Sequence, residues 1–240
     1  VEGQQRLAAE LAEAAAYVRS LLPPPFTGSL SLDWRFLPSA ELGGDALGYH
    51  RLPDGRLAVY VLDVCGHGMA SALLSIAVHT SLAPGRLPGV DLGDPAAVLS
   101  VLNTAFPSER HGSLFFTIWY GVLDPARREI SFSSAGHPAA VLFTGPDRGS
   151  LVMSELMSGG PMIGVFPDAE YVTGTEKLGA SSRLFVFSDG LYEIVRQDGS
   201  LVPYEDFLAA FEEGVAKGGQ VLDRMVEFAR SVRGTDSLDD

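Results

Sequence analysis

The sequence is poor in three features that each indicate a particular class of protein. It has one cysteine in 240 residues, Cys65, which excludes a disulfide framework and indicates a reducing, cytoplasmic compartment. It has no run of about 18 apolar residues, so it predicts no membrane insertion, and its opening residues VEGQQRLAAE lack the basic start and apolar core of a signal peptide. It has only 17 Lys and Arg against 30 Asp and Glu, a formal net charge of −13. Such an acidic surface repels phosphates, which argues against nucleic acid as a partner, but it attracts metal cations.

What the sequence does contain is enough apolar material for a folded core. Hydrophobic residues make up 46% of the chain, which rules out a disordered protein. The length of 240 residues fits one large domain or two small ones, since a domain averages roughly 100–200 residues. Residue 1 is Val rather than Met, so we expect the chain to be a piece of a longer protein.

The first predicted element is a helix over residues 4–22. This stretch is rich in Ala, Leu, Glu and Gln, contains no Gly or Pro, and is followed by three prolines. Its apolar residues follow the spacing of a coiled-coil seam two heptads long: Leu7, Leu11, Ala14, Val18 and Leu21. So short a seam leaves two alternatives. The helix packs either on its own domain or on the same helix of a second chain in a homodimer.

The rest of the chain predicts strands and helices in alternating groups. The expected strands are residues 29–37, 46–52, 57–63, 115–123, 128–134, 139–144 and 183–188, and the expected helices are residues 69–82, 94–106, 203–213 and 219–232. Asp94 is the expected N-cap of the second helix in this set, with Pro95 at its first position. Residues 145–180 are rich in glycine and are expected to form loops. This order is typical of antiparallel sheets with helices packed outside them.

Several aspartates stand at the ends of predicted strands or at the end of the chain: Asp45, Asp63, Asp189, Asp239 and Asp240. A carboxylate at the mouth of a buried strand is costly unless it is hydrogen-bonded or paired with a cation. The pattern therefore has two interpretations. The aspartates either share a site for hard divalent cations, which prefer oxygen ligands, or they belong to ordinary acidic turns, in which Asp-Gly is common.

An ordered set of short motifs adds to this pattern. The motifs are Leu21-Leu22-Pro23, Gly43-Gly44-Asp45, Asp63-Val64-Cys65-Gly66-His67-Gly68, Asn103, Phe116-Thr117, Ala135-Gly136-His137-Pro138, Gly160-Pro161-Met162-Ile163-Gly164 and Ser188-Asp189-Gly190, with Asp239-Asp240 beginning a closing motif. Taken together they resemble the PPM family of metal-dependent Ser/Thr phosphatases, relatives of protein phosphatase 2C. The similarity is greatest to the bacterial branch that includes the sporulation stage II phosphatase and the stress-response regulators of anti-sigma signalling.

The resemblance implies an α+β fold, a four-layer α-β-β-α sandwich of two antiparallel sheets flanked by helices. Residues 1–25 would be an N-terminal linker helix, and residues 26–240 would be the phosphatase domain without its last strand. Two Mn²⁺ or Mg²⁺ ions would lie at one end of the sandwich. Asp63 would bridge both ions beside the carbonyl of Val64, Asp45 would bind one ion, and Asp189 with Asp239 or Asp240 would bind the other. Asp45, Asp63 and Asp189 would be the catalytic residues, through a water activated by two metals rather than a covalent phospho-enzyme.

The function implied by the resemblance is hydrolysis of phosphoserine or phosphothreonine in a protein. The implied substrate is a phosphorylated anti-sigma-factor antagonist in a sigma-factor partner-switching pathway, and the full-length protein would carry an upstream sensor or receiver domain. One alternative is a catalytically weak or inactive regulator of the same fold that acts by protein binding. Another, without the resemblance, is a cation-binding adhesion or lectin-like β domain. Cys65 is interpreted as a small structural residue, His67 as the start of a helix, and His137 as a brace for a tight turn.

Overall fold

The computed structural model describes residues 13, 15–37, 43–87, 89–196 and 198–233. The chain divides into two compact units. Unit 1 comprises Val1–Pro23 and Leu42–Ser188, and unit 2 comprises Pro24–Glu41 and Asp189–Asp240. Each unit has its own set of secondary-structure elements.

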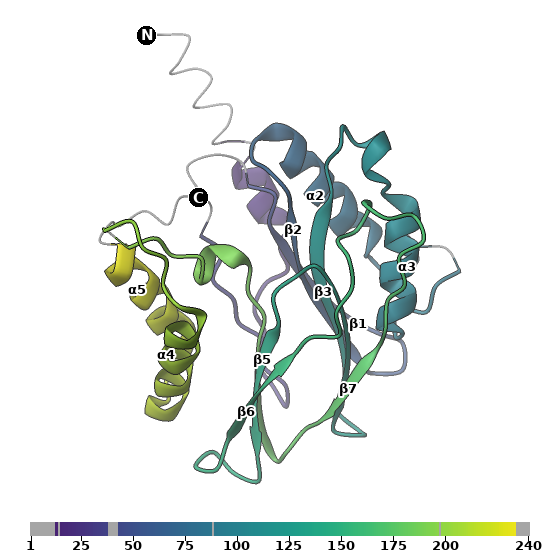
Figure 1. Ribbon diagram of the computed structural model, residues 1–240. Helices are drawn as coiled ribbons and strands as arrows, with labels where there is room; N and C mark the ends of the chain where they lie inside the picture. The colour runs from purple at the N-terminus through teal and green to yellow at the C-terminus, as the bar shows by residue number, and fades with distance from the viewer. Residues whose placement is uncertain (1–12, 14, 38–42, 88, 197, 234–240) are drawn as a thin grey trace. The chain divides into compact units, whose positions relative to one another are not determined.

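Unit 1 is built on a five-stranded antiparallel sheet with the strand order β1-β2-β3-β4-β7 (Figure 1). Its strands are β1 (Ala46–Arg51), β2 (Leu57–Val64), β3 (Phe116–Asp124), β4 (Glu129–Ala135) and β7 (Gly174–Lys177). A second antiparallel sheet has the order β6-β5-β8, with β5 (Ala140–Gly145), β6 (Val152–Leu156) and β8 (Ser181–Phe185). These sheets confirm the predicted α+β class with antiparallel sheets.

The two sheets pack on each other through an apolar cluster. Trp119 and Phe132 from the larger sheet stack with ring centroids 6.0 Å apart, and they meet Leu142 and Leu156 from the smaller sheet. The indole nitrogen of Trp119 donates a hydrogen bond to the carbonyl of Leu156 at 2.9 Å, so this buried polar group is satisfied. The cluster shows which face of the larger sheet points toward the smaller one.

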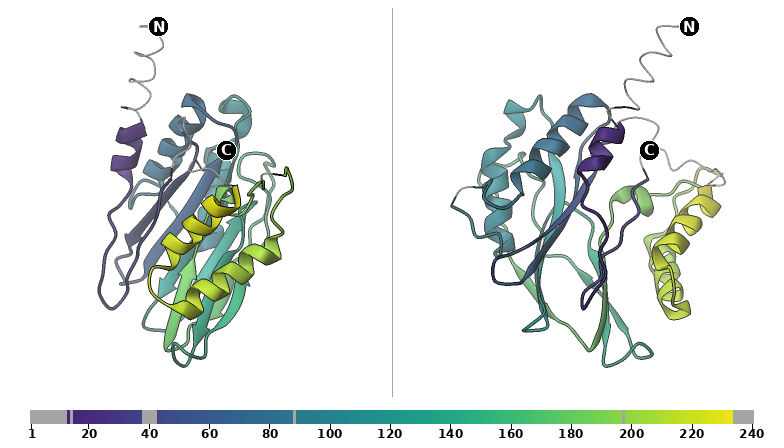
Figure 2. Two further views of the ribbon diagram at one scale, coloured as in Figure 1. Left: turned by 90° about the vertical axis from the view of Figure 1, so that its left-hand side faces the viewer. Right: turned by 180° about the vertical axis from the view of Figure 1, so that it is seen from behind.

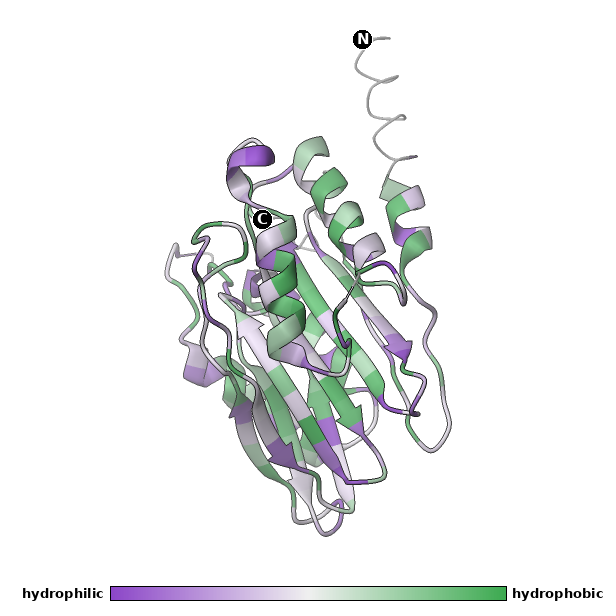
Figure 3. Cartoon of the chain, turned by 90° about the vertical axis from the view of Figure 1, so that its right-hand side faces the viewer, coloured by the Kyte–Doolittle hydropathy of each residue, from purple (hydrophilic) through white to green (hydrophobic). Residues whose placement is uncertain are grey.

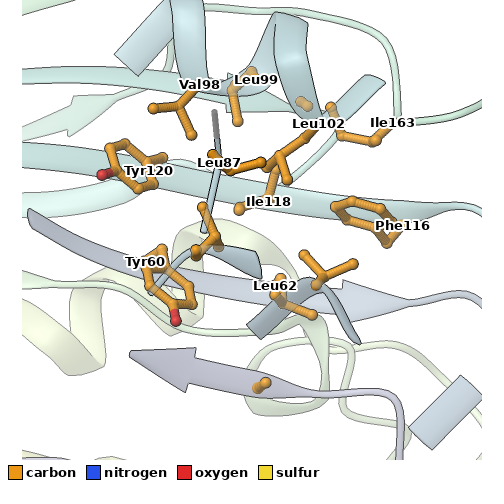
Figure 4. Close-up of a cluster of buried hydrophobic side chains, with 14 of the residues drawn as sticks. Tyr60, Leu62, Leu87, Val98, Leu99, Leu102, Phe116, Ile118, Tyr120 and Ile163 are labelled. Carbon is orange, nitrogen blue, oxygen red and sulfur yellow. The ribbon is translucent and has the colours of Figure 1, made fainter. Parts of the chain in front are cut away.

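The opposite face of the larger sheet is covered by helices α2 (Met69–Ser81) and α3 (Pro95–Ala105). Figure 4 shows the core beneath them, in which Leu62, Phe116 and Ile118 from the strands lie near Leu102 of α3. Asp94 caps α3 as predicted, because its side chain accepts a hydrogen bond from the amide of Ala97. The short 3₁₀ helix η1 (Ser108–Arg110) lies between α3 and β3.

Unit 2 contains helices α4 (Tyr204–Lys217) and α5 (Val221–Arg233), which run side by side (Figure 2), and the 3₁₀ helix η2 (Asp189–Leu191). The extended segment that includes Arg35 is tied to α5 by a bidentate ion pair. The Nε and Nη2 atoms of Arg35 lie 2.5 Å and 3.1 Å from the two carboxylate oxygens of Asp223.

Two of the predicted assignments are wrong. Residues 29–37 form no strand, since Leu32 makes only an isolated bridge to Phe26 and Arg35 is bound to α5. Residues 145–180 are not all loop, because they contain the edge strands β6 and β7. Both strands are short: β6 has five residues, of which Leu156 is buried in the core, and β7, with the sequence GTEK, has no buried residue. Neither segment is long enough to show a clear alternation of apolar and polar residues. Figure 3 shows hydrophobic residues concentrated in the central strands and their covering helices.

The N-terminal helix is described at Glu13 and at residues 15–21, where it is helical as predicted. The seam residues Leu7, Leu11 and Ala14 lie outside the described residues. At the other end of the helix, the backbone of Leu21 opposes the lowering of the His79 pKa that burial of this imidazole causes. Within the part of the chain that the structure describes, no helix is long and apolar enough to cross a membrane.

Candidate functional site

Asp63 lies at the end of β2, where the sheet places it in a row of polar residues. Along β2, Tyr60, Leu62 and Val64 belong to the core beneath the helices. Since side chains alternate along a strand, Asp63 faces the opposite way, on the side of the smaller sheet. The register pairs Asp63 with Thr117 of β3, so these two side chains share one face.

Asp45 extends this row on the other side of Asp63. The β1–β2 ladder ends at the pair Ala46–Leu62, and beyond it the amide of Val64 donates to the carbonyl of Gly44 at 3.3 Å. Asp45 lies between these two contacts, beside Asp63 of the neighbouring strand. The chains approach more closely here than in a regular ladder, in which opposed Cβ atoms are about 4.5–5.5 Å apart.

Gly44 is required for this arrangement because β1 approaches β2 closely there. A Cβ atom at Gly44 would lie 2.5 Å from the carbonyl oxygen and 2.9 Å from the Cβ of Val64. Because Gly44 has no side chain, the backbone just before Asp45 can lie directly against the backbone of Val64, which follows Asp63. The carbonyl of Val64, the predicted backbone ligand, is placed beside Gly44 by the same contact.

Ser188 holds the side chain of Asp45. Its hydroxyl donates a hydrogen bond to Oδ2 of Asp45 at 2.9 Å, across 143 positions of sequence. This contact of Ser188 is not predicted by the sequence. Its position immediately before Asp189, in the motif Ser188-Asp189-Gly190, is the local feature that points to the site.

His137 and Thr117 form a second supporting pair. His137 Nδ1 lies 2.8 Å from the hydroxyl oxygen of Thr117, which the register places opposite Asp63. The imidazole is 3% exposed. Burial lowers the pKa of His137 to about 4, so the ring is neutral near pH 7. The side chain of His137 contacts Thr117 of β3, the register partner of Asp63.

Cys65 has the structural role that was predicted. Its backbone amide donates to the carbonyl of Phe115, and its Sγ accepts the Phe115 amide at 3.2 Å. His67 is exposed in the turn that precedes α2, whose N-cap is Gly68. Asn103 is a satisfied buried amide, since it donates to the carbonyl of Phe166 at 2.9 Å and accepts from the amide of Gly164 at 2.8 Å.

The structure brings together only part of the predicted ligand set. Asp45, Asp63 and Val64 converge in unit 1, as described above. Asp189 begins unit 2, where its carbonyl accepts the amides of Tyr192 and Glu193, and Asp239 and Asp240 lie outside the described residues. Among the residues that the structure describes, no group of three His, Cys, Asp or Glu side chains could hold a metal ion.

The donor set of this end of unit 1 fits a hard cation. Two carboxylates face the same way from adjacent strands, and like charges opposite one another are destabilising by themselves. The other side-chain oxygen atoms near the two carboxylates are the hydroxyls of Ser188 and Thr117. Oxygen-rich, acidic surroundings of this kind suit Mg²⁺ or Mn²⁺ rather than a thiolate-preferring metal.

Comparison with known proteins relates these observations to a family. A family model described as "Stage II sporulation protein E (SpoIIE)" matches residues 53–240. The phosphoserine phosphatase RsbP of Bacillus subtilis is 29% identical over 178 residues, which is 72% of this chain and 42% of RsbP. The phosphoserine phosphatase RsbU of the same organism is 25% identical over 222 residues, which is 91% of this chain and 64% of RsbU. The chain thus spans less than two thirds of either relative.

Solved structures share the fold. The SiaA-PP2C domain of Pseudomonas aeruginosa superposes with a TM-score of 0.78 at 20% identity, covering 99% of this chain and 95% of that domain. RsbX, solved in complex with magnesium, has a TM-score of 0.55 at 18% identity, covering 83% of this chain and 84% of RsbX. These similarities confirm the predicted fold class.

Proposed function

Because this chain belongs to the stage II sporulation protein E (SpoIIE) family, we propose that it is a metal-dependent phosphatase acting on phosphoserine or phosphothreonine in proteins. The observation that carries the proposal is the carboxylate row, in which Asp63 lies between Asp45 and Thr117 on one face of the sheet. The names of RsbP and RsbU, both phosphoserine phosphatases, support the same reaction.

The proposed metal ligands are the carboxylates of Asp45, Asp63 and Asp189, the carbonyl of Val64, and Asp239 or Asp240. The expected ions are two Mn²⁺ or Mg²⁺, and the magnesium named with RsbX supports a divalent cation. Such ions, when bound, supply charge neutralisation at the phosphoryl group and activation of water.

The protein's own contribution is to hold the carboxylates in place before substrate arrives. Ser188 fixes one oxygen of Asp45 by a hydrogen bond. Asp63 extends from a strand that is paired on both sides, which restricts its backbone. Cys65, the only cysteine, uses its sulfur as an acceptor for a backbone amide. These contacts favour direct attack by water over a thiol nucleophile.

The proposed biological setting is a sigma-factor partner-switching pathway. The relatives RsbP and RsbU, together with a solved protein that joins RsbU and RsbW domains in Mycobacterium tuberculosis, support this setting. We propose a phosphorylated anti-sigma-factor antagonist as substrate, an upstream sensor or receiver domain in the full-length protein, and a cytoplasmic location. We also propose that the N-terminal helix pairs with its copy in a homodimer.

The proposed reaction is tested by replacing the central carboxylate. Asp63→Asn removes one negative charge and keeps the shape, so turnover of para-nitrophenyl phosphate and of a phosphoserine peptide in Mn²⁺ should fall by more than ~100-fold. This expectation follows because even residues that merely support metal ligands are worth about 10–100-fold.

The matched control is Asp147→Asn. Asp147 lies in an exposed turn, where its side chain accepts the amide of Gly149, so turnover should stay unchanged. Turnover of Asp63→Asn within about twofold of the wild type would contradict the proposal. A wild-type chain with no Mn²⁺-dependent turnover on either substrate would instead favour the non-catalytic regulator.

A further inference from the structure

His137 occupies a turn whose backbone is held on both sides. Gly136, the residue before it, has φ 65°, a conformation that favours glycine, and its amide donates to the carbonyl of Gly160 at 2.8 Å. A Cβ atom at Gly136 would lie 2.5 Å from Cγ of Met162. The turn is therefore fixed by close packing, and the imidazole that follows it has a defined position.

The two nitrogens of His137 face different parts of the site. Nδ1 lies 2.8 Å from the hydroxyl of Thr117, opposite Asp63 in the ladder. Nε2 is buried and has no hydrogen-bond partner among the described residues. The backbone of Phe187 opposes the lowering of the His137 pKa that burial causes. Phe187 immediately precedes Ser188, the residue that holds Asp45.

The imidazole therefore contacts the hydroxyl of Thr117, which is the register partner of Asp63. On the side of Asp45, the nearest link is by sequence, since Phe187 precedes Ser188, whose hydroxyl binds Asp45. A buried, neutral histidine in this place serves as a rigid spacer between the two sheets, since Thr117 belongs to the larger sheet and Ser188 follows β8 of the smaller one.

We propose that His137 is a positioning residue for the candidate metal site, which acts by fixing the Thr117 hydroxyl beside Asp63. The inference rests on the proposed phosphatase function and adds to it a pair of residues that touch neither substrate nor the reacting atoms. Partners that orient metal ligands are typically worth about 10–100-fold in metal affinity.

The test measures Mn²⁺ binding by calorimetry, together with kcat and KM, in four single variants and one double variant. Thr117→Val keeps the shape but removes the hydroxyl, and His137→Leu removes both nitrogens. Both should weaken Mn²⁺ binding by about 10–100-fold. Thr117→Ser and His137→Asn keep a hydrogen-bonding group near its original position and should restore most of the affinity. The double variant Thr117→Val/His137→Leu should bind Mn²⁺ no more weakly than the weaker-binding of the two single variants, because each change removes the same interaction.

The control separates positioning from general destabilisation. Leu99→Ala opens a cavity in the core beneath α3, where Leu99 is fully buried, and should lower stability without changing Mn²⁺ affinity. Mn²⁺ affinity within twofold of the wild type for both Thr117→Val and His137→Leu would overturn the inference. If Asp63→Asn also bound Mn²⁺ like the wild type, the proposed function itself would fail, so the two failures are distinguishable.

Discussion

The close approach of β1 to β2 at Gly44 makes a sharp prediction about the variant Gly44→Ala. The new methyl group would lie 2.5 Å from the carbonyl oxygen of Val64, 2.9 Å from the Cβ of Val64 and 3.1 Å from the amide nitrogen of Val64. Two of these three atoms are backbone atoms of a paired central strand, so they cannot rotate away. Relief requires β1 to move from β2 by about 0.9 Å to reach an ordinary contact of 3.4 Å.

The expected effect has two parts. Overpacking of this kind costs about 1–3 kcal/mol in the free energy of unfolding. The displacement also falls on the residue before Asp45, so it changes the distance between the two carboxylates. A misplacement of about 1 Å can cost about 100-fold in rate. We therefore expect a variant that still folds, with a moderate loss of stability, but whose Mn²⁺-dependent turnover falls by about 100-fold.

The neighbouring glycine provides the control. A Cβ at Gly43 would lie 4.0 Å from the amide nitrogen of Asp45, an ordinary contact, so Gly43→Ala should change stability by less than about 0.5 kcal/mol. Urea unfolding measures the first effect, and turnover of para-nitrophenyl phosphate in Mn²⁺ measures the second. Equal stability and equal turnover for the two alanine variants would refute the reasoning from strand spacing.

Two further predictions concern pH and association. The folded-state pKa of His137 is lowered to about 4 by burial, whereas the unfolded value is about 6.5. Because only the unfolded chain takes up this proton, the contribution is fully present above pH 6.5 and is lost as the pH falls toward 4, by about 2 kcal/mol between pH 7.5 and 5. Urea unfolding at both pH values should show that His137→Asn removes this part of the pH dependence, and an unchanged dependence would contradict it. For the proposed homodimer, Leu11→Glu places a charge in the helix seam and should give a monomer in analytical ultracentrifugation, whereas a wild-type chain already monomeric at tens of micromolar would rule the dimer out.

Part of the fold could be predicted because its signals are local. Helices α2 and α3 and the central strands β2, β3 and β4 carry apolar patterns, caps and turn residues that act over a few positions. The N-cap of α3 is an example, since Asp94 and the amide that it accepts are three residues apart. The edge strands β6 and β7 could not be found in this way, because they have only five and four residues and a segment so short gives no clear apolar alternation.

In the candidate site, too, some features follow from neighbouring residues and others depend on the tertiary structure. The positions of Asp63 at the end of a buried strand and of Asp45 at the start of another could be predicted from the residues, because strand ends and glycine turns are local properties. The contacts of Ser188 with Asp45 across 143 positions, and of His137 with Thr117 opposite Asp63, arise only in the folded chain. Such contacts depend on the register of the sheets and on how the two sheets pack, and neither is written in the residues that surround each side chain.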